Sequence, residues 1–242
     1  MPAQLINNCI KAVGKIVCRD FGQSGSGFFI DDEGHFLTNN HVVTKMGIDR
    51  LGAIRLDYSR DIYVKLGNNA YNASIIIDEN SDRPFVFDYC ILKLNDSPSD
   101  HICVADLSQI NQGERVFAIG YPSGFEMPIV TSGIISAMLR MPSHRNSLHT
   151  MKTFLTDAVA TYGNSGGPLI RSTDGKVIGI VTMPHEIRNI IKDRLQRHLA
   201  NVTPPINDII KFIMRYLHEG FVYAISLEHV LNDPVFPQGG DN

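Results

Sequence analysis

Apolar residues repeat along the chain with two different periods, and each period predicts one type of element. Near the amino terminus they recur at helical spacing, which predicts a short amphipathic helix over residues 3–14. The residues with this spacing are Leu5, Ile6, Cys9, Ile10 and Val13. From residue 15 to residue 182, short apolar runs of strand length are separated by turns rich in Gly, Asn and Asp. The chain is therefore predicted to be mainly β.

Most of these apolar runs give clear strand predictions. The strands are expected over residues 15–21, 28–30, 35–37, 53–57, 61–66, 71–78, 89–94, 115–119, 176–182 and 220–226. Residues 129–140 are expected to form a long strand or a bent hairpin. Gly22–Gly27 holds three glycines and is predicted to be a turn, and residues 227–232 begin a final helix.

Residues 185–218 have a different pattern from the rest of the chain. Apolar residues fall on one helical face on each side of Pro204-Pro205, with Lys and Arg on the opposite sides. This spacing predicts two amphipathic helices. They pack on the rest of the protein as a helical hairpin, or they form a lid or a partner-docking surface over a substrate cleft.

Composition and charge exclude several classes of partner. The 242 residues carry a formal net charge of −3 and no run of Lys or Arg, so nucleic acid is not an expected partner. No apolar run approaches the roughly 18 residues of a membrane span, so no membrane is expected. The first residues lack the basic and apolar regions of a signal peptide, which favours the cytoplasm.

The four cysteines point to neither a metal site nor a disulfide framework. Cys9, Cys18, Cys90 and Cys103 form no Cys-x-x-Cys pair and no Cys/His ligand spacing. We expect no metal ion and no cofactor. We expect all four to be buried, reduced thiols, which agrees with a reducing compartment.

One stretch carries candidate chemistry. Gly163-Asn-Ser-Gly-Gly-Pro168 places the hydroxyl of Ser165 among three glycines. Glycine permits positive φ and close approach to the main chain, so such a turn presents a serine to a substrate carbonyl. The same turn aims the N–H groups of Gly163 and Ser165 at a developing oxyanion. A Gly-rich turn with an ordinary serine remains the alternative.

A nucleophilic serine needs a base and an acid that orients the base. His41 follows Thr38-Asn-Asn40, which is rich in capping residues, and Asp88 precedes an apolar strand. Asp57 and Asp61 are rival candidates for the acid. The order His, Asp, Ser is one of the known orders for a catalytic triad.

These segments resemble the trypsin-like serine peptidases, most closely their HtrA/Deg branch. The matching stretches are Gly25-Ser-Gly-Phe-Phe-Ile30, Thr38-Asn-Asn-His-Val-Val43, Asp88-Tyr-Cys-Ile-Leu-Lys93, Thr156-Asp-Ala158 and Gly163-Asn-Ser-Gly-Gly-Pro-Leu169. The resemblance covers residues 15–182, with a further match near residues 220–231.

The resemblance implies a chymotrypsin-like fold of two six-stranded antiparallel β-barrels, with a helical insertion near the carboxyl end. We expect one peptidase domain over residues 1–242. Its parts are an N-terminal helix at 1–14, a first barrel at 15–110, a second barrel with a final helix at 111–182 and 219–232, and the insertion at 183–218. No PDZ domain is expected.

The resemblance also implies roles for individual residues. His41, Asp88 and Ser165 become the catalytic triad, and the segment Gly163, Asn164 and Ser165 forms the oxyanion hole. The specificity pocket is formed by Val159, Ala224, Ile225 and Ser226. Val159 is apolar and none of the four is a carboxylate that could receive Lys or Arg, which predicts cleavage after small or medium aliphatic residues. Zymogens of this fold have Asp where this chain has Asn164, so we expect loop rearrangement rather than proteolytic activation.

Two other functions are weighed against a protein- or peptide-cleaving enzyme. Gly163-x-Ser165-x-Gly167 also fits the nucleophile elbow of α/β-hydrolases, but that elbow needs a helix where this chain has Gly-Gly-Pro and a strand hairpin. A catalytically idle binding or chaperone module of the chymotrypsin fold is the second alternative. The sequence carries no signal for the oligomeric state.

Overall fold

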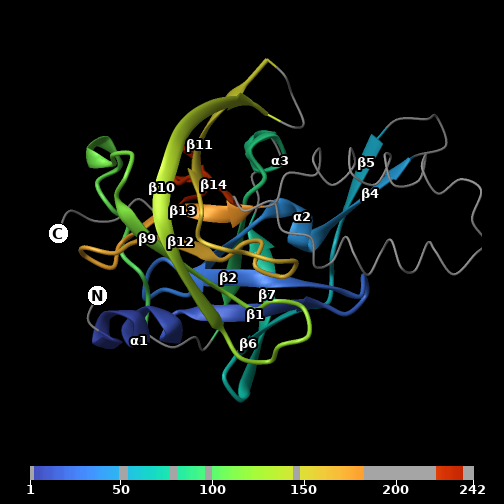
Figure 1. The fold of residues 1–242 in the computed structure, drawn as a ribbon. Helices are drawn as coiled ribbons and strands as arrows, with labels where there is room; N and C mark the ends of the chain where they lie inside the picture. Colours follow the sequence, from blue (N-terminus) through green and yellow to red (C-terminus); the bar gives the residue numbers. More distant parts are fainter. Residues whose placement is uncertain are drawn as a thin grey trace, which may run out of the picture.

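Two closed β-barrels form the body of the protein in a computed structural model (Figure 1). The structure describes residues 3–48, 54–76, 81–95, 100–143, 148–182 and 222–236. Each barrel has six strands, and every pairing of neighbouring barrel strands is antiparallel. The predicted chymotrypsin-like fold class is confirmed for this part of the chain.

The first barrel follows the strand order β1-β2-β3-β8-β7-β6. Its strands are β1 (Val13–Cys18), β2 (Gln23–Phe29), β3 (His35–Thr38), β6 (Ile62–Leu66), β7 (Asn69–Ile76) and β8 (Cys90–Leu94). Alternation of inward and outward side chains fills the barrel with aromatic and branched residues. Phe28, Phe36 and Leu92 are fully buried there.

The second barrel follows the order β10-β11-β14-β13-β12-β9. Its strands are β9 (Arg115–Gly120), β10 (Ile129–Pro142), β11 (Thr150–Thr156), β12 (Pro168–Arg171), β13 (Val177–Thr182) and β14 (Val222–Ser226). Apolar residues of this barrel, among them Phe117, Ile180 and Ile225, belong to the same buried cluster as the first barrel's core. The two barrels therefore share a continuous apolar contact.

Short helices connect or flank the strands. They are α1 (Ala3–Lys11), α2 (Asn40–Val43), α3 (Arg83–Phe87), the 3-10 helix η1 (Leu107–Gln109) and α6 (Glu228–Leu231). The predicted N-terminal helix and final helix are confirmed within a few residues. The two helices predicted over residues 185–218 lie outside the described residues. The predicted domain boundaries stay a prediction.

The turn predicted over Gly22–Gly27 is correct only at Gly22, which has φ of 61°, and is wrong beyond it, because Gln23–Phe29 is strand β2. A Cβ added to Gly27 would lie 2.2 Å from Phe36 Cε1, and one added to Gly25 would lie 2.7 Å from the Val42 methyl carbons. These glycines therefore let neighbouring segments pack closely against a strand, a role that glycine also has inside sheets.

A separate two-stranded sheet follows α2 directly. It pairs β4 (Thr44–Ile48) with β5 (Ile54–Tyr58) in antiparallel register and lies outside both barrels (Figure 1). The sequence predicted a strand close to β5 but not its partner β4. This sheet is attached at its base, where Ser59 N–H donates to Val43 C=O at 2.9 Å.

Candidate active site

Ser165 lies in a tight turn that leads into β12. Gly163 and Gly166 have φ of 102° and 90°, in the left-handed region that favours glycine. A Cβ at Gly166 would lie 2.1 Å from the carbonyl oxygen of Ser26, so no other residue fits this turn unstrained. Ser165 is 8% exposed. The glycines of the motif thus shape a turn that is packed against β2 of the first barrel.

His41 is presented by the short helix α2. Asn39 occupies the N-cap position but its side chain does not cap the helix. The Asn39 side-chain amide instead donates to the carbonyl oxygen of Asp88 at 2.9 Å. Val42 and Val43 are buried on the same helix and fix it to the first barrel. The capping residue predicted from sequence therefore joins His41's helix to the Asp88 segment.

His41 and Asp88 are joined by two hydrogen bonds. The main-chain N–H of His41 donates to Asp88 Oδ1 at 3.0 Å, and His41 Nδ1 lies 2.8 Å from Asp88 Oδ2. Because a carboxylate only accepts hydrogen bonds, Nδ1 carries the proton in this pair. In the neutral form of a ring bonded in this way the lone pair is on Nε2, the nitrogen that a base uses. The His41 and Asp88 side chains are 17% and 12% exposed.

Asp88 comes before an apolar strand, as the sequence indicates, but Tyr89 lies between the two. Asp88 is instead the C-cap of α3 and has φ of 54°. Strand β8 begins only at Cys90. The left-handed conformation turns the chain sharply, so the carboxylate faces both His41 and Thr182 of the second barrel. Thr182 Oγ1 donates to Asp88 Oδ2 at 3.2 Å, a contact that the sequence did not indicate.

Main-chain contacts bring the Ser165 turn beside the segment that carries His41. Ser26 N–H donates to Ser165 C=O at 2.9 Å. A Cβ on the preceding residue, Gly25, would lie 3.1 Å from Ser165 O and 2.7 Å from the Val42 methyl carbons. Gly25 therefore lies close to both Ser165 and Val42, the residue that follows His41. The contact is made by the main chain, not by the Ser165 hydroxyl.

The candidate oxyanion segment has two unused N–H donors within the part of the chain that the structure describes. Neither Gly163 N–H nor Ser165 N–H makes a hydrogen bond there. Asn164 N–H donates to Thr161 C=O at 3.0 Å, so it is engaged elsewhere. Ser123 N–H holds Tyr162 C=O at 2.7 Å and thereby fixes the peptide that carries Gly163 N–H. Gly163 and Ser165 are the donors available to a ligand.

The residues predicted for the specificity pocket are in different environments. Ala224, Ile225 and Ser226 are fully buried in β14, between β11 and β13. The side chain of Val159, in contrast, is 48% exposed. The assignment of these four residues to one pocket stays a prediction.

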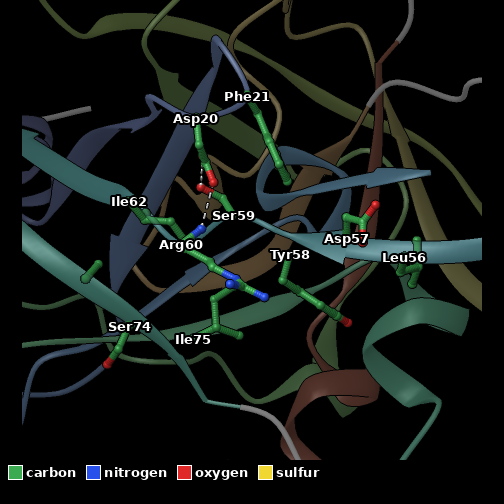
Figure 2. A pocket seen from close by; sticks show the side chains of 11 residues that line it. Asp20, Phe21, Leu56, Asp57, Tyr58, Ser59, Arg60, Ile62, Ser74 and Ile75 are labelled. Carbon is green, nitrogen blue, oxygen red and sulfur yellow. Dashed lines mark hydrogen bonds between the residues drawn. The ribbon is translucent and has the colours of Figure 1, made fainter. Parts of the chain in front are cut away.

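The rival acids lie elsewhere. Asp61 pairs with Arg19 at 3.9 Å on the surface. Asp57, in β5, lines a pocket of about 710 Å³ together with Asp20 and Arg60 (Figure 2). In that pocket Asp20 accepts hydrogen bonds from Ser59 Oγ at 2.5 Å and from the Arg60 N–H at 2.9 Å, which lower the pKa of Asp20. Asp88 is the carboxylate that faces His41.

The cysteines are free thiols, as predicted, but only three of them are buried. Cys9, Cys18 and Cys90 are buried, whereas Cys103 is exposed. Burial raises the pKa of Cys18 to about 11, so this thiol stays protonated. Among the described residues, no group of His, Cys, Asp or Glu is arranged to hold a metal ion. No described helix is long and apolar enough to cross a membrane.

Curated relatives of similar sequence are named as proteases. The chain is 37% identical over 157 residues to a probable DegP-like periplasmic serine endoprotease of Hahella chejuensis, covering 65% of this chain and 29% of the relative. It is 38% identical over 165 residues to serine protease HTRA1 of Xenopus tropicalis, covering 66% and 31%. The chain thus spans about a third of these relatives' length. The relative from Hahella chejuensis is named as periplasmic, which does not support a cytoplasmic location for this chain. The cytoplasmic location stays a prediction.

Solved structures show the same fold. An HtrA-type protease, AlgW with tripeptide, superposes with a TM-score of 0.66 at 24% identity, covering 95% of this chain and 60% of the other. The active form of Rv3671c protease from M. tuberculosis gives a TM-score of 0.66 at 18% identity, covering 100% and 88%. A family model described as the trypsin-like peptidase domain matches residues 25–180. With two closed antiparallel barrels and this match over more than half of its length, the chain belongs to the trypsin-like peptidase family.

Proposed function

We propose that this chain is a serine endopeptidase that hydrolyses peptide bonds through an acyl-enzyme. The observation that carries the proposal is the pair of contacts between His41 and Asp88, beside the Gly-rich turn of Ser165. The Asp88 carboxylate lies 3.0 Å from His41 N and 2.8 Å from His41 Nδ1. The relatives named as proteases support the same reaction class. An idle binding module has no specific observation in its favour.

In this proposal Ser165 Oγ attacks the scissile carbonyl, and His41 Nε2 takes the hydroxyl proton. The imidazolium then gives that proton to the leaving amine, and water repeats the cycle to release the acyl group. Asp88 stays ionised and stabilises the positive charge on the ring. Thr182 and Asn39 hold the Asp88 segment, so the acid keeps its position while His41 gains and loses a proton.

The tetrahedral intermediate carries a negative oxygen, which needs hydrogen-bond donors already in position. Gly163 N–H and Ser165 N–H are the two donors we assign to it. Removing one such donor typically lowers turnover by about 10²–10³-fold. Asn164, whose N–H is engaged by Thr161, contributes to the turn rather than to the hole.

We further propose protein or peptide substrates with a small or medium aliphatic residue before the cleaved bond. Buried Ala224 and Ile225 and the apolar Val159 support this preference because none of them can pair with a basic side chain. Cleavage profiles of a peptide library test the idea. Dominant cleavage after Lys or Arg would contradict it.

A fluorophosphonate probe separates an active enzyme from an idle module. The probe reacts with a serine that an adjacent base activates, and it leaves ordinary serines unmodified. We expect labelling of the wild-type chain and loss of labelling in Ser165→Ala. Ser172→Ala, a serine in the turn after β12, serves as a matched control that keeps its labelling. Equal labelling of wild type and Ser165→Ala would refute the assignment.

A further inference from the structure

Ser26 connects the first barrel to the turn that holds Ser165. It lies in β2 opposite Lys15 of β1 and is fully buried. Its N–H donates to Ser165 C=O at 2.9 Å, and its hydroxyl donates to Gly163 C=O at 2.7 Å. The hydroxyl also accepts from Tyr121 N–H at 2.8 Å, while the Ser26 carbonyl accepts from Thr38 Oγ1 at 2.7 Å. Every polar group of this buried residue is used.

Ser26 bonds to two peptide units of the turn that are separated by one other unit. A peptide unit is planar, so holding its C=O also fixes the direction of its N–H. Ser26 holds two units through their carbonyls, those that begin at Gly163 and at Ser165. The unit between them carries Ser165 N–H, and the unit before them carries Gly163 N–H. Because Ser26 holds the unit that links these two, it restrains the angle between the two N–H groups assigned to the oxyanion.

Glycine makes this restraint useful. Gly163 has φ of 102°, and a glycine rotates more freely than any other residue when nothing holds it. The units that carry Gly163 N–H and Ser165 N–H are held at their carbonyls, Tyr162 by Ser123 N–H at 2.7 Å and Asn164 by Gly167 N–H at 3.0 Å. The unit that links them is held at its N–H by Thr161 C=O and at its C=O by Ser26, so removal of the Ser26 hydroxyl takes away one of its two restraints.

The surrounding chain leaves room for this hydroxyl. A Cβ on Gly120 would lie 3.0 Å from Ser26 Oγ and 2.7 Å from Asn164 Oδ1. Glycine at position 120, the last residue of β9, therefore leaves room for the Ser26 hydroxyl to reach Gly163 from β2. The bond from Thr38 Oγ1 to Ser26 C=O extends this network to the segment that leads into His41.

We propose that Ser26 is a positioning residue that sets the geometry of the oxyanion hole from the opposite barrel. The inference rests on the proposed peptidase function. Ser26→Ala removes the bond to Gly163 and keeps the main-chain bond to Ser165. We expect kcat for an aliphatic peptide substrate to fall about 10–100-fold, less than the full loss of one oxyanion donor. KM should change less than about twofold, because the ground-state carbonyl makes little use of the hole.

Inhibitor affinity gives a readout that a merely structural role would not move. A tripeptide boronic acid ending in boro-valine forms a tetrahedral adduct with the serine and places an oxygen in the hole. The same tripeptide ending in valinamide binds without reacting. Ser26→Ala should weaken the boronic acid by the same factor as kcat and leave the valinamide compound within about twofold.

Ser59→Ala is the matched control. Ser59 Oγ donates to Asp20 Oδ1 at 2.5 Å, and Ser59 is 5% exposed, so this variant loses a buried serine's hydrogen bond outside the candidate site. We expect it to lose a similar amount of stability in urea, with kcat and boronic acid affinity close to wild type. If both variants lose the same fraction of kcat, or if Ser26→Ala weakens both ligands equally, the inference is wrong.

Two further outcomes separate the inference from the function on which it rests. If fluorophosphonate fails to label the wild-type chain, the peptidase proposal fails and the inference falls with it. If wild type is labelled and Ser26→Ala keeps full kcat, the inference alone fails. Should Ser26→Ala not fold, Ser26→Cys keeps a weaker donor in the same place and should give an intermediate kcat; an unchanged kcat there overturns the inference as well.

Discussion

His229 is expected to make the folded protein less stable in mild acid. Burial of its ring, together with nearby Arg83, Arg140 and Lys152, lowers the pKa of His229 from 6.5 to about 4, and Glu228 opposes the effect. The neutral ring is also required structurally, because Nε2 accepts a hydrogen bond from Lys152 N–H at 2.9 Å. Protonation would place a proton on the atom that must accept.

The same residue joins α6 to α3, the helix that ends at Asp88. The His229 ring is stacked on Phe87 with centroids 4.4 Å apart, and Arg83 Nη2 donates to His229 C=O at 2.7 Å. Tyr89 OH, just past Asp88, donates to the Asp233 carboxylate that follows α6. Protonation of His229 therefore loosens the contact between α6 and α3, the helix that ends at the candidate acid.

The sign of the effect follows from the two pKa values. The unfolded chain takes up a proton near pH 6.5, whereas the folded chain resists it down to about pH 4. The stabilisation is therefore complete above pH 6.5 and is lost progressively as the pH falls towards 4. A pKa unit corresponds to about 1.4 kcal/mol, so the upper limit is roughly 3 kcal/mol. Residual solvent contact of the ring screens the effect, and we expect about 1–2 kcal/mol.

Urea unfolding at several pH values measures this loss. His229→Gln keeps an acceptor for Lys152 N–H but does not titrate in this range. The difference in unfolding free energy between wild type and His229→Gln should move against wild type by about 1–2 kcal/mol between pH 7 and pH 4.5. If the difference stays constant over this range, or moves in favour of wild type, the reasoning about His229 is refuted.

Three other substitutions test the site. Gly166→Ala, at φ of 90° and 2.1 Å from a carbonyl oxygen, should cost more than about 2 kcal/mol in urea unfolding, and a wild-type-like midpoint would contradict the packing. Asp88→Asn should slow fluorophosphonate labelling by about 10³-fold or more while thermal unfolding changes little, because the amide favours the wrong tautomer of His41; unchanged labelling would exclude Asp88 as the acid. Thr182→Val removes a 3.2 Å bond to that carboxylate and should lower kcat about tenfold at similar KM, whereas an effect on KM alone would assign Thr182 to substrate binding.

The residues of the candidate site could be found from sequence because their motifs are local. The turn around Ser165 needs glycines at fixed positions, and the structure has Gly163 and Gly166 at positive φ, as a tight turn requires. His41 follows capping residues, and α2 begins at Asn40. Most strands were also predictable, because burial of one face makes apolar and polar residues alternate along the sequence.

Contacts between distant segments could not be predicted in this way. Asp88 has a left-handed conformation imposed by a five-residue helix, α3, which is too short for a periodic pattern. Gly25 and Gly27 led to the prediction of a turn, although both lie in strand β2, where Val42 and Phe36 pack against them. Nothing local to Ser26 shows that its hydroxyl meets a carbonyl 137 residues away. The Ser26 contact is decided by how the two barrels meet.

The central claim is that Ser165 is a nucleophile activated by His41. The most direct measurement is peptide mapping by mass spectrometry after reaction with a fluorophosphonate. A single phosphonyl group on Ser165 in the wild-type chain, absent from His41→Ala, is the predicted result. A modified residue other than Ser165, or an equally modified Ser165 in His41→Ala, would contradict the claim.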